Sequence, residues 1–159
     1  MVKLGFRKVH PDAKIPAKAH AGDAGMDICS IEDIELAALR PCIVRTGLAV
    51  YIPEGYELQV RPRSGLASKG VSVWNSPGTI DSGYKGEIGV ILVFCAPPGY
   101  FIDPAAKFVT TDVPPKYHIS KGDRIAQLVL APVIPCETCE VGDVGSSDRG
   151  TGGFGSTGL

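Results

Sequence analysis

The sequence predicts an all-β domain, and three observations carry this prediction. Twenty glycines and thirteen prolines divide the 159 residues into short pieces. The runs between them are of β type, and several alternate apolar and polar side chains with the two-residue period of a half-buried strand. No long stretch has the period of an amphipathic helix. Many short strands separated by Gly and Pro turns are typical of a sandwich, a jelly roll or a barrel.

The expected elements follow from where these runs begin and end. We expect one short helix that begins at Ser64, with Ser64 as its cap, and runs to Lys69. The segment 75–87 reads as a hairpin that carries Asp81 and Tyr84 near its tip. The strands are expected over residues 42–52, 56–61, 71–74, 87–94 and 125–134.

The last residues form a glycine-rich tail with little side-chain bulk to bury. Residues 149–159 contain one Arg and one Phe among mostly Gly, Ser and Thr, so packing within the tail cannot order it. One cation, one ring and many accessible backbone amides suit a ligand that has phosphates and a flat base. We therefore divide the chain into a β domain over residues 1–145 and a flexible lid arm over residues 146–159.

Composition and charge argue against several classes of function. A formal net charge of −1 disfavours binding to nucleic acid or to an anionic membrane surface, because both need a basic face. No apolar run reaches membrane-spanning length, and residues 1–8 lack the apolar core of a signal peptide. We expect a cytoplasmic protein, or a nuclear one if the source is eukaryotic or viral. Residues 150–155 match G-x-G-x-x-G but lack the flanking strand and helix of a dinucleotide site.

The five cysteines do not form a disulfide framework, because their number is odd and their spacing irregular. Cys136 and Cys139 form a C-x-x-C pair. A zinc site needs a second pair or nearby histidines, and neither accompanies this one. Ordinary thiols in a reducing compartment are the simpler interpretation.

Four interior segments carry polar groups that packing does not require. Residues 21–28 form a small-residue turn, with Asp27 at the start of an apolar stretch. Residues 61–67 place two arginines and a serine around a tight bend, and an arginine can bind a phosphate through two parallel hydrogen bonds. The hairpin over residues 75–87 is the third segment, and residues 122–127, the fourth, read as a turn entering a strand.

Together with the tail, these segments resemble the five sequence motifs of the homotrimeric dUTP pyrophosphatases (dUTPases). The resemblance extends from about Lys3 to Leu159. It implies a jelly roll or distorted β-barrel that uses Mg²⁺ and in-line attack of water on the α-phosphorus to hydrolyse dUTP to dUMP and pyrophosphate. Such an enzyme limits uracil in DNA and supplies dUMP for dTMP synthesis. It also implies a homotrimer with active sites shared between subunits. At each site one subunit gives the first, second and fourth motifs, a neighbour gives the third motif, and the remaining subunit gives the tail.

The resemblance assigns roles to residues of the expected hairpin. Asp81 would deprotonate the attacking water, since a carboxylate stays anionic near neutral pH and can accept a proton. Tyr84 would pack beneath the deoxyribose and leave no space for a 2′-hydroxyl. Backbone groups around Asn75, Gly78 and Ile80 would pair with the edge of uracil and reject cytosine and thymine.

The implied phosphate ligands come from the second and fourth motifs, and they are Arg63, Ser64, Gly65 and Gln127. Asp27 would act through water on a Mg²⁺ ion that is held mainly by phosphate oxygens. The tail would close over the substrate and exclude water other than the nucleophile. Its implied substrate-binding residues are Arg149 on the γ-phosphate, Phe154 stacked on uracil, Gly155 and Ser156.

One segment departs from the family's pattern. Residues 96–117 form a longer, proline-rich insert between the strand over residues 87–94 and the fourth motif. Insertions in surface loops cost little loop-closure entropy, so a tolerated loop is the simpler interpretation. A surface for a protein partner is the alternative.

Two other functions are alternatives to dUTP hydrolysis. The related dCTP deaminases place a catalytic Glu ten residues after the hairpin aspartate, where this chain has Ile91, a side chain that cannot move a proton. A binding protein that senses nucleotides through an idle site is expected to have lost the base or the lid arginine. Asp81 and Arg149 are both present in this chain.

Overall fold

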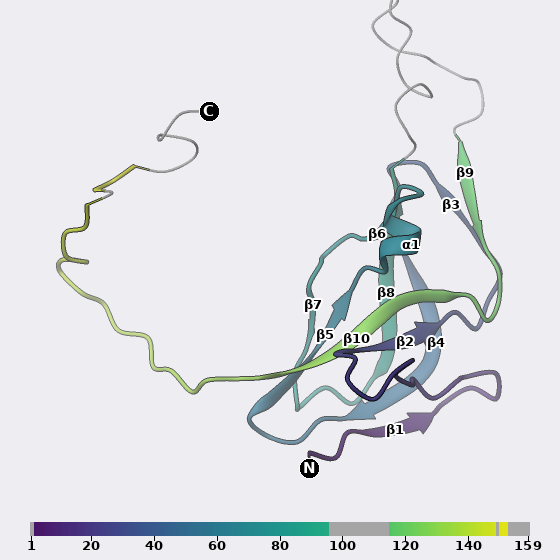
Figure 1. The fold of residues 1–159 in the computed structure, drawn as a ribbon, viewed down its shortest axis with the longest axis horizontal. Coiled ribbons are helices and arrows are strands. Elements are labelled where there is room, and N and C mark those ends of the chain that lie inside the picture. Colours follow the sequence, from purple (N-terminus) through teal and green to yellow (C-terminus); the bar gives the residue numbers. More distant parts are fainter. Residues whose placement is uncertain (1, 96–114, 149, 153–159) are drawn as a thin grey trace, which may run out of the picture.

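The computed structural model describes residues 2–95, 115–148 and 150–152, and its strands form three antiparallel sheets (Figure 1). The first sheet has the order β1 (Gly5–Lys8), β4 (Cys42–Tyr51), β8 (Glu87–Phe94) and β6 (Val71–Val73). The second has the order β2 (Gly25–Cys29), β10 (Arg124–Pro132), β5 (Tyr56–Arg61) and β7 (Gly78–Ile80). β3 (Ile34–Ala37) pairs with β9 (Lys116–Ile119), and the helix α1 spans Ser64–Ala67. The expected all-β fold class is confirmed.

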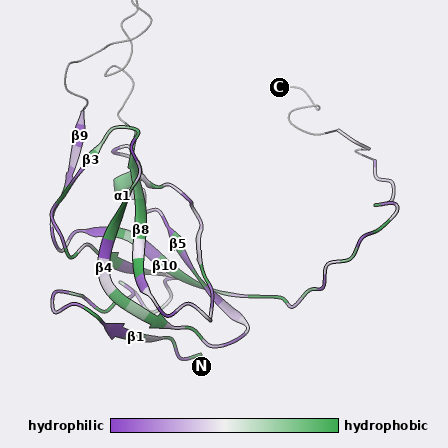
Figure 2. Cartoon of the chain, turned by 180° about the vertical axis from the view of Figure 1, so that it is seen from behind, coloured by the Kyte–Doolittle hydropathy of each residue, from purple (hydrophilic) through white to green (hydrophobic). Residues whose placement is uncertain are grey.

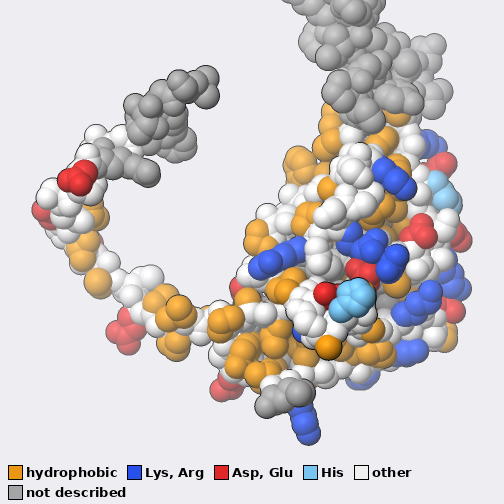
Figure 3. All heavy atoms as spheres, viewed as in Figure 1, with side chains coloured by type: hydrophobic (Ala, Val, Ile, Leu, Met, Phe, Trp, Pro, Cys, Tyr) orange, Lys and Arg blue, Asp and Glu red, His pale blue; other side chains and the backbone are white. Residues whose placement is uncertain are grey.

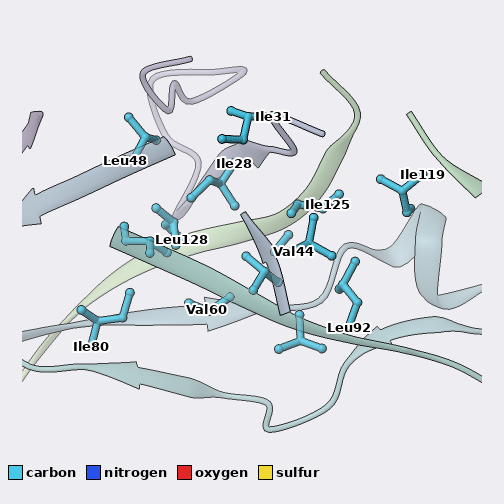
Figure 4. Packing of buried hydrophobic residues seen from close by; sticks show 14 of the residues in the cluster. Ile28, Ile31, Val44, Leu48, Val60, Ile80, Leu92, Ile119, Ile125 and Leu128 are labelled. Atoms are coloured by element: carbon cyan, nitrogen blue, oxygen red, sulfur yellow. The ribbon is translucent and has the colours of Figure 1, made fainter. Parts of the chain in front are cut away.

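Strands of all three sheets contribute to one hydrophobic core (Figure 4). Leu92 of the first sheet, Leu128 of the second and Ile119 of the small sheet are fully buried. Removing each such side chain from water contributes about 1.5–3 kcal/mol. Hydrophobic residues dominate the C-terminal half of β8, whereas the edge strand β1 is hydrophilic (Figure 2). The core therefore fixes the central strands.

The five strands expected from the sequence are present, with ends that differ by at most two residues. The structure adds five strands that the sequence pattern did not predict. Each is only three to five residues long, which is too short to display a period. One of them, β2, contains Asp27, so this residue lies in a paired strand and not at the end of a turn.

The hairpin expected over residues 75–87 was a wrong prediction. β7 pairs with β5 in the second sheet, whereas β8 pairs with β4 and β6 in the first. The segment between them, which carries Asp81 and Tyr84, is thus a turn that crosses from one sheet to the other. Glycine at position 78 allows β7 to lie close to β5, because a Cβ there would be only 3.3 Å from Cβ of Val60.

The expected cap of the helix was also wrong. Ser64 is the first helical residue, and the residue before it, Arg63, occupies the N-cap position with extended dihedral angles. No side chain caps the helix, because the guanidinium of Arg63 has no acceptor for the free N–H groups, and it donates to Asp27 instead. The helix ends at Ala67, two residues before the expected end.

After Pro132 the chain leaves the β body (Figure 1). Residues 133–148 contain no strand or helix, and all are exposed. The expected division after residue 145 stays a prediction. Of the expected insert, residues 96–114 lie outside the described part of the chain, whereas residues 116 and 117 belong to β9. No helix in the described ranges is long and apolar enough to cross a membrane.

Candidate functional site

The first, second and fourth motifs (residues 21–28, 61–67 and 122–127) meet at β10. β10 lies between β2 and β5, so Gln127 stands opposite Asp27 on one side and Arg61 on the other. The chain turns at Pro62 directly after β5, which brings Arg63 back toward β2. Lys and Arg side chains gather across the middle of this face of the molecule (Figure 3).

Asp27 is bound by two arginines. Its carboxylate accepts hydrogen bonds from Nε and Nη2 of Arg63, at 2.7 and 3.2 Å, and from Nη1 of Arg124, at 3.1 Å. The side chains of Asp27 and Arg63 are 27% and 24% exposed, so water screens this pair only in part. Two cations facing one carboxylate leave a net positive charge, which suits an anionic ligand.

A pocket of about 300 Å³ opens beside this cluster, and its lining residues are Asp27, Arg63, Ser64, Gly65 and Gln127. The amide of Gln127 donates from Nε2 to the carbonyl of Pro62 at 2.8 Å, which holds the bend after β5 in place. The same side chain fills the space that a Cβ at Gly25 would need, so a larger residue at position 25 would displace the amide of Gln127. All five residues expected on the phosphate and metal side are thus brought together.

The third motif forms a separate hollow of about 190 Å³, and its lining residues are Thr79, Ile80, Asp81, Tyr84, Ile88 and Gly89. The backbone N–H of Tyr84 donates to the carbonyl of Asp81 at 3.0 Å, which closes the turn between the sheets. The ring of Tyr84 is 45% exposed and its hydroxyl donates to the carbonyl of Glu87 at 2.7 Å. Among the described residues, none lines both hollows.

The remaining expected site residues are placed as follows. Asn75 and Gly78 lie side by side, with Nδ2 of Asn75 3.2 Å from where a Cβ of Gly78 would be. Neither residue lines either hollow. The tail residues Arg149, Phe154, Gly155 and Ser156 lie outside the described part of the chain.

Sequence reasoning missed the role of Arg124. In the fourth motif a role was expected for Gln127 but not for Arg124, yet the side chain of Arg124 reaches Asp27 and its carbonyl accepts from Nη1 of Arg63 at 3.4 Å. The sequence did not indicate this contact, because a cation at the start of a strand has many explanations and Asp27 lies 97 residues from Arg124 in sequence. The pairing of β10 with β2 brings Arg124 within reach of Asp27.

One thiol lies close to this cluster. Cys29 follows Asp27 by two residues in β2, and burial raises the pKa of its thiol. The nearby positive charges of Lys14 and Arg124 act in the opposite direction and are weaker. Cys29 therefore stays protonated near neutral pH and is not an activated nucleophile.

The chain is similar to known proteins in both sequence and fold. The family model described as dUTPase matches residues 11–96 and 109–158, which leaves residues 97–108 of the expected insert unmatched. A deoxyuridine 5'-triphosphate nucleotidohydrolase of Wolinella succinogenes is 46% identical over 158 residues, covering 99% of this chain and 95% of the relative.

Two solved structures are also similar. The dUTPase of Staphylococcus bacteriophage 80alpha with dUpNHpp has a TM-score of 0.79 and 32% identity, and the match covers 99% of each chain. A mutant dUTPase from phage phi11 of S. aureus, described for its coordination of a structural Mg(II) ion, has a TM-score of 0.72 and 32% identity, with 89% of this chain and 98% of that chain covered.

Proposed function

Since the chain belongs to the dUTPase family, we propose that it hydrolyses dUTP to dUMP and pyrophosphate. The observation that carries this proposal is the pocket in which the Asp27–Arg63 pair lies beside Ser64, Gly65 and Gln127. The product dUMP would feed dTMP synthesis, and removal of dUTP would limit uracil in DNA. We expect this reaction to take place in the cytoplasm.

The phosphate chain of the substrate is proposed to bind along this pocket. The guanidinium of Arg63 has a fixed fork of donors that matches phosphate oxygens, as it now matches the carboxylate of Asp27. Gly65 has open space where a Cβ would be, so a phosphate can approach its backbone closely. The hydroxyl of Ser64 and the amide of Gln127 would complete the set of donors.

The donor set of the pocket also fits the proposed Mg²⁺. Asp27 is the one carboxylate among its lining residues, and the described residues contain no group of three or more His, Cys, Asp or Glu that could hold a metal by themselves. Such a site suits an ion held chiefly by phosphate oxygens and water. Bound there, Mg²⁺ would offset the negative charge that grows on the leaving pyrophosphate.

Asp81 is proposed to orient the attacking water and accept its proton, with Tyr84 beneath the sugar of the same substrate. These residues line a hollow distinct from the phosphate pocket. A homotrimer that joins the hollow of one subunit to the pocket of another would supply both halves. Arg149 and Phe154 of the tail, outside the described residues, are proposed to close over the γ-phosphate and the uracil.

The test is pyrophosphate release in the presence of Mg²⁺ from dUTP, dCTP, dTTP and UTP in parallel, with ammonia assayed alongside. We expect release from dUTP alone and no ammonia. Ammonia from dCTP would assign the chain to deaminase chemistry. No reaction with any of the four nucleotides would contradict the proposed function and favour a binding protein.

A further inference from the structure

Tyr84 is held from two sides by the residues that follow it. Its hydroxyl donates to the carbonyl of Glu87 at 2.7 Å. Its ring lies so close to Gly86 that a Cβ there would be 2.7 Å from the hydroxyl oxygen and 2.9 Å from Cζ. The ring position is therefore set by the backbone of residues 86 and 87.

The backbone of Glu87 is in turn held by its own side chain. One carboxylate oxygen accepts the backbone N–H of Gly47 at 2.8 Å, and the other accepts from Nη2 and Nε of Arg45, at 2.9 and 3.3 Å. β4 has an irregularity here, because the register with β8 shifts between Arg45 and Ala49. Such a bulge takes backbone groups out of the ladder, and Glu87 provides the acceptor that the N–H of Gly47 needs.

We propose that Glu87, fixed by Arg45 and Gly47, is the positioning residue that holds the ring of Tyr84 where it excludes a 2′-hydroxyl. This inference rests on the proposed function, in which Tyr84 packs beneath the deoxyribose. Glu87 does not touch the substrate. It anchors the first residue of β8 to β4, and its carbonyl then fixes the phenol of Tyr84.

This anchor differs from an ordinary surface ion pair. Lys116 and Glu35 also pair, at 2.6 Å, but their side chains are 47% and 57% exposed. Exposed pairs of that kind contribute little to stability. The Glu87 side chain is 25% exposed and binds a backbone N–H as well as the guanidinium of Arg45. Glu35→Ala is therefore a matched control.

The first test is the ratio of kcat/KM for dUTP to that for UTP. We expect Glu87→Ala and Tyr84→Phe each to lower this ratio about tenfold, the loss expected for one hydrogen bond, and the double variant to lower it no further. Glu87→Gln, which keeps the volume and one acceptor oxygen, should lie between Glu87→Ala and the wild type. A fall in kcat/KM that is equal for both nucleotides, or effects on the ratio that add in the double variant, would overturn the proposal.

The second test does not depend on hydrolysis. In protein labelled with ¹³C at tyrosine Cζ, the NMR signal of Tyr84 is assigned by its absence in Tyr84→Phe. We expect Glu87→Ala to shift this signal and Glu35→Ala to leave it unchanged. An unshifted signal in Glu87→Ala would overturn the positioning role even if the enzyme is active. Failure of the wild type to hydrolyse dUTP would contradict the proposed function and leave this NMR result decisive for Glu87.

Discussion

Asp27 and Arg63 are joined by two parallel hydrogen bonds, from Nε to Oδ1 at 2.7 Å and from Nη2 to Oδ2 at 3.2 Å. The pair ties β2 to the residue that precedes α1, across 36 positions of sequence. It holds the guanidinium over the pocket before any ligand arrives, so little side-chain entropy remains to be lost when phosphates bind. A fixed fork of this kind depends on arginine and not merely on positive charge.

Replacing Arg63 by lysine should therefore be costly although the charge is kept. We expect Arg63→Lys to lower kcat/KM for dUTP about 10²-fold, since a charged hydrogen bond contributes about 1.5–3 kcal/mol and the second one of the fork is lost. Arg61→Lys is the control, because Arg61 is exposed and its guanidinium donates to the side chain of Gln59. Equal activity of the two variants in steady-state kinetics would contradict the bidentate role.

Asp81→Asn separates chemistry from binding. The amide keeps the shape of the side chain but cannot take the proton of water, so we expect kcat to fall about 10³-fold with little change in affinity. Binding of a non-hydrolysable dUTP analogue is measured by calorimetry and turnover by pyrophosphate release. Asp33→Asn is the control, as Asp33 accepts the backbone N–H of Lys121 far from this motif in sequence. A near-normal kcat for Asp81→Asn would remove Asp81 from the role of base.

Glycine at position 86 leaves room for the ring of Tyr84. In Gly86→Ala the new Cβ would lie 2.7 Å from the hydroxyl oxygen, so the ring must move. A displacement of about 1 Å at a reacting centre can cost up to about 10²-fold in rate, and we expect a loss of that order in kcat/KM for dUTP. Gly83→Ala, in the same turn, meets nothing within 4 Å and should retain activity. Comparable losses in the two variants would mean that the turn as a whole is sensitive.

The sequence predicted the central strands, because β4, β5, β8 and β10 are long enough to display a period, and its motifs named the five residues that line the pocket at Asp27. The roles of these residues stay predictions. The sequence could not predict that residues 75–87 cross between sheets. A Gly-rich turn between two strands looks the same whether those strands pair with each other or, as β7 and β8 do, with β5 in one sheet and with β4 and β6 in the other. The partners of Arg124 and Glu87 were hidden for a related reason, since each lies more than 35 residues away.

The Glu87 anchor should also affect stability in acid. The hydrogen bond from Arg45 is the main cause that lowers the pKa of Glu87 below its usual 4.5. Because the folded pKa is the lower one, the unfolded chain binds more protons, so this contribution is present above pH 4.5 and is lost as the pH falls through the folded value. We expect the difference in free energy of unfolding between wild type and Glu87→Gln to shrink from pH 6 to pH 3 in urea titrations. A constant difference over that range would contradict the assignment.

The separation of the two hollows allows a direct test of a shared site. If the phosphate pocket of one subunit works with the Asp81 hollow of another, then Arg63→Ala and Asp81→Asn damage different chains of the same site. Each variant alone should be nearly inactive, because every site in it has lost one half. After the two are unfolded and refolded together, a site is intact when an Asp81→Asn chain supplies the pocket and an Arg63→Ala chain supplies the hollow. Random mixing in a cyclic homo-oligomer makes about a quarter of the sites intact, so we expect about a quarter of the wild-type activity.

The control for this mixing experiment is each variant refolded with itself, which should stay inactive. Arg63→Ala mixed with Gln127→Ala is a second control, since both residues line the same pocket and no arrangement of subunits restores it. Recovery only in the first mixture would establish that Arg63 and Asp81 of different chains act on one substrate. Activity no higher than that of the separate variants would contradict a site that is shared between subunits.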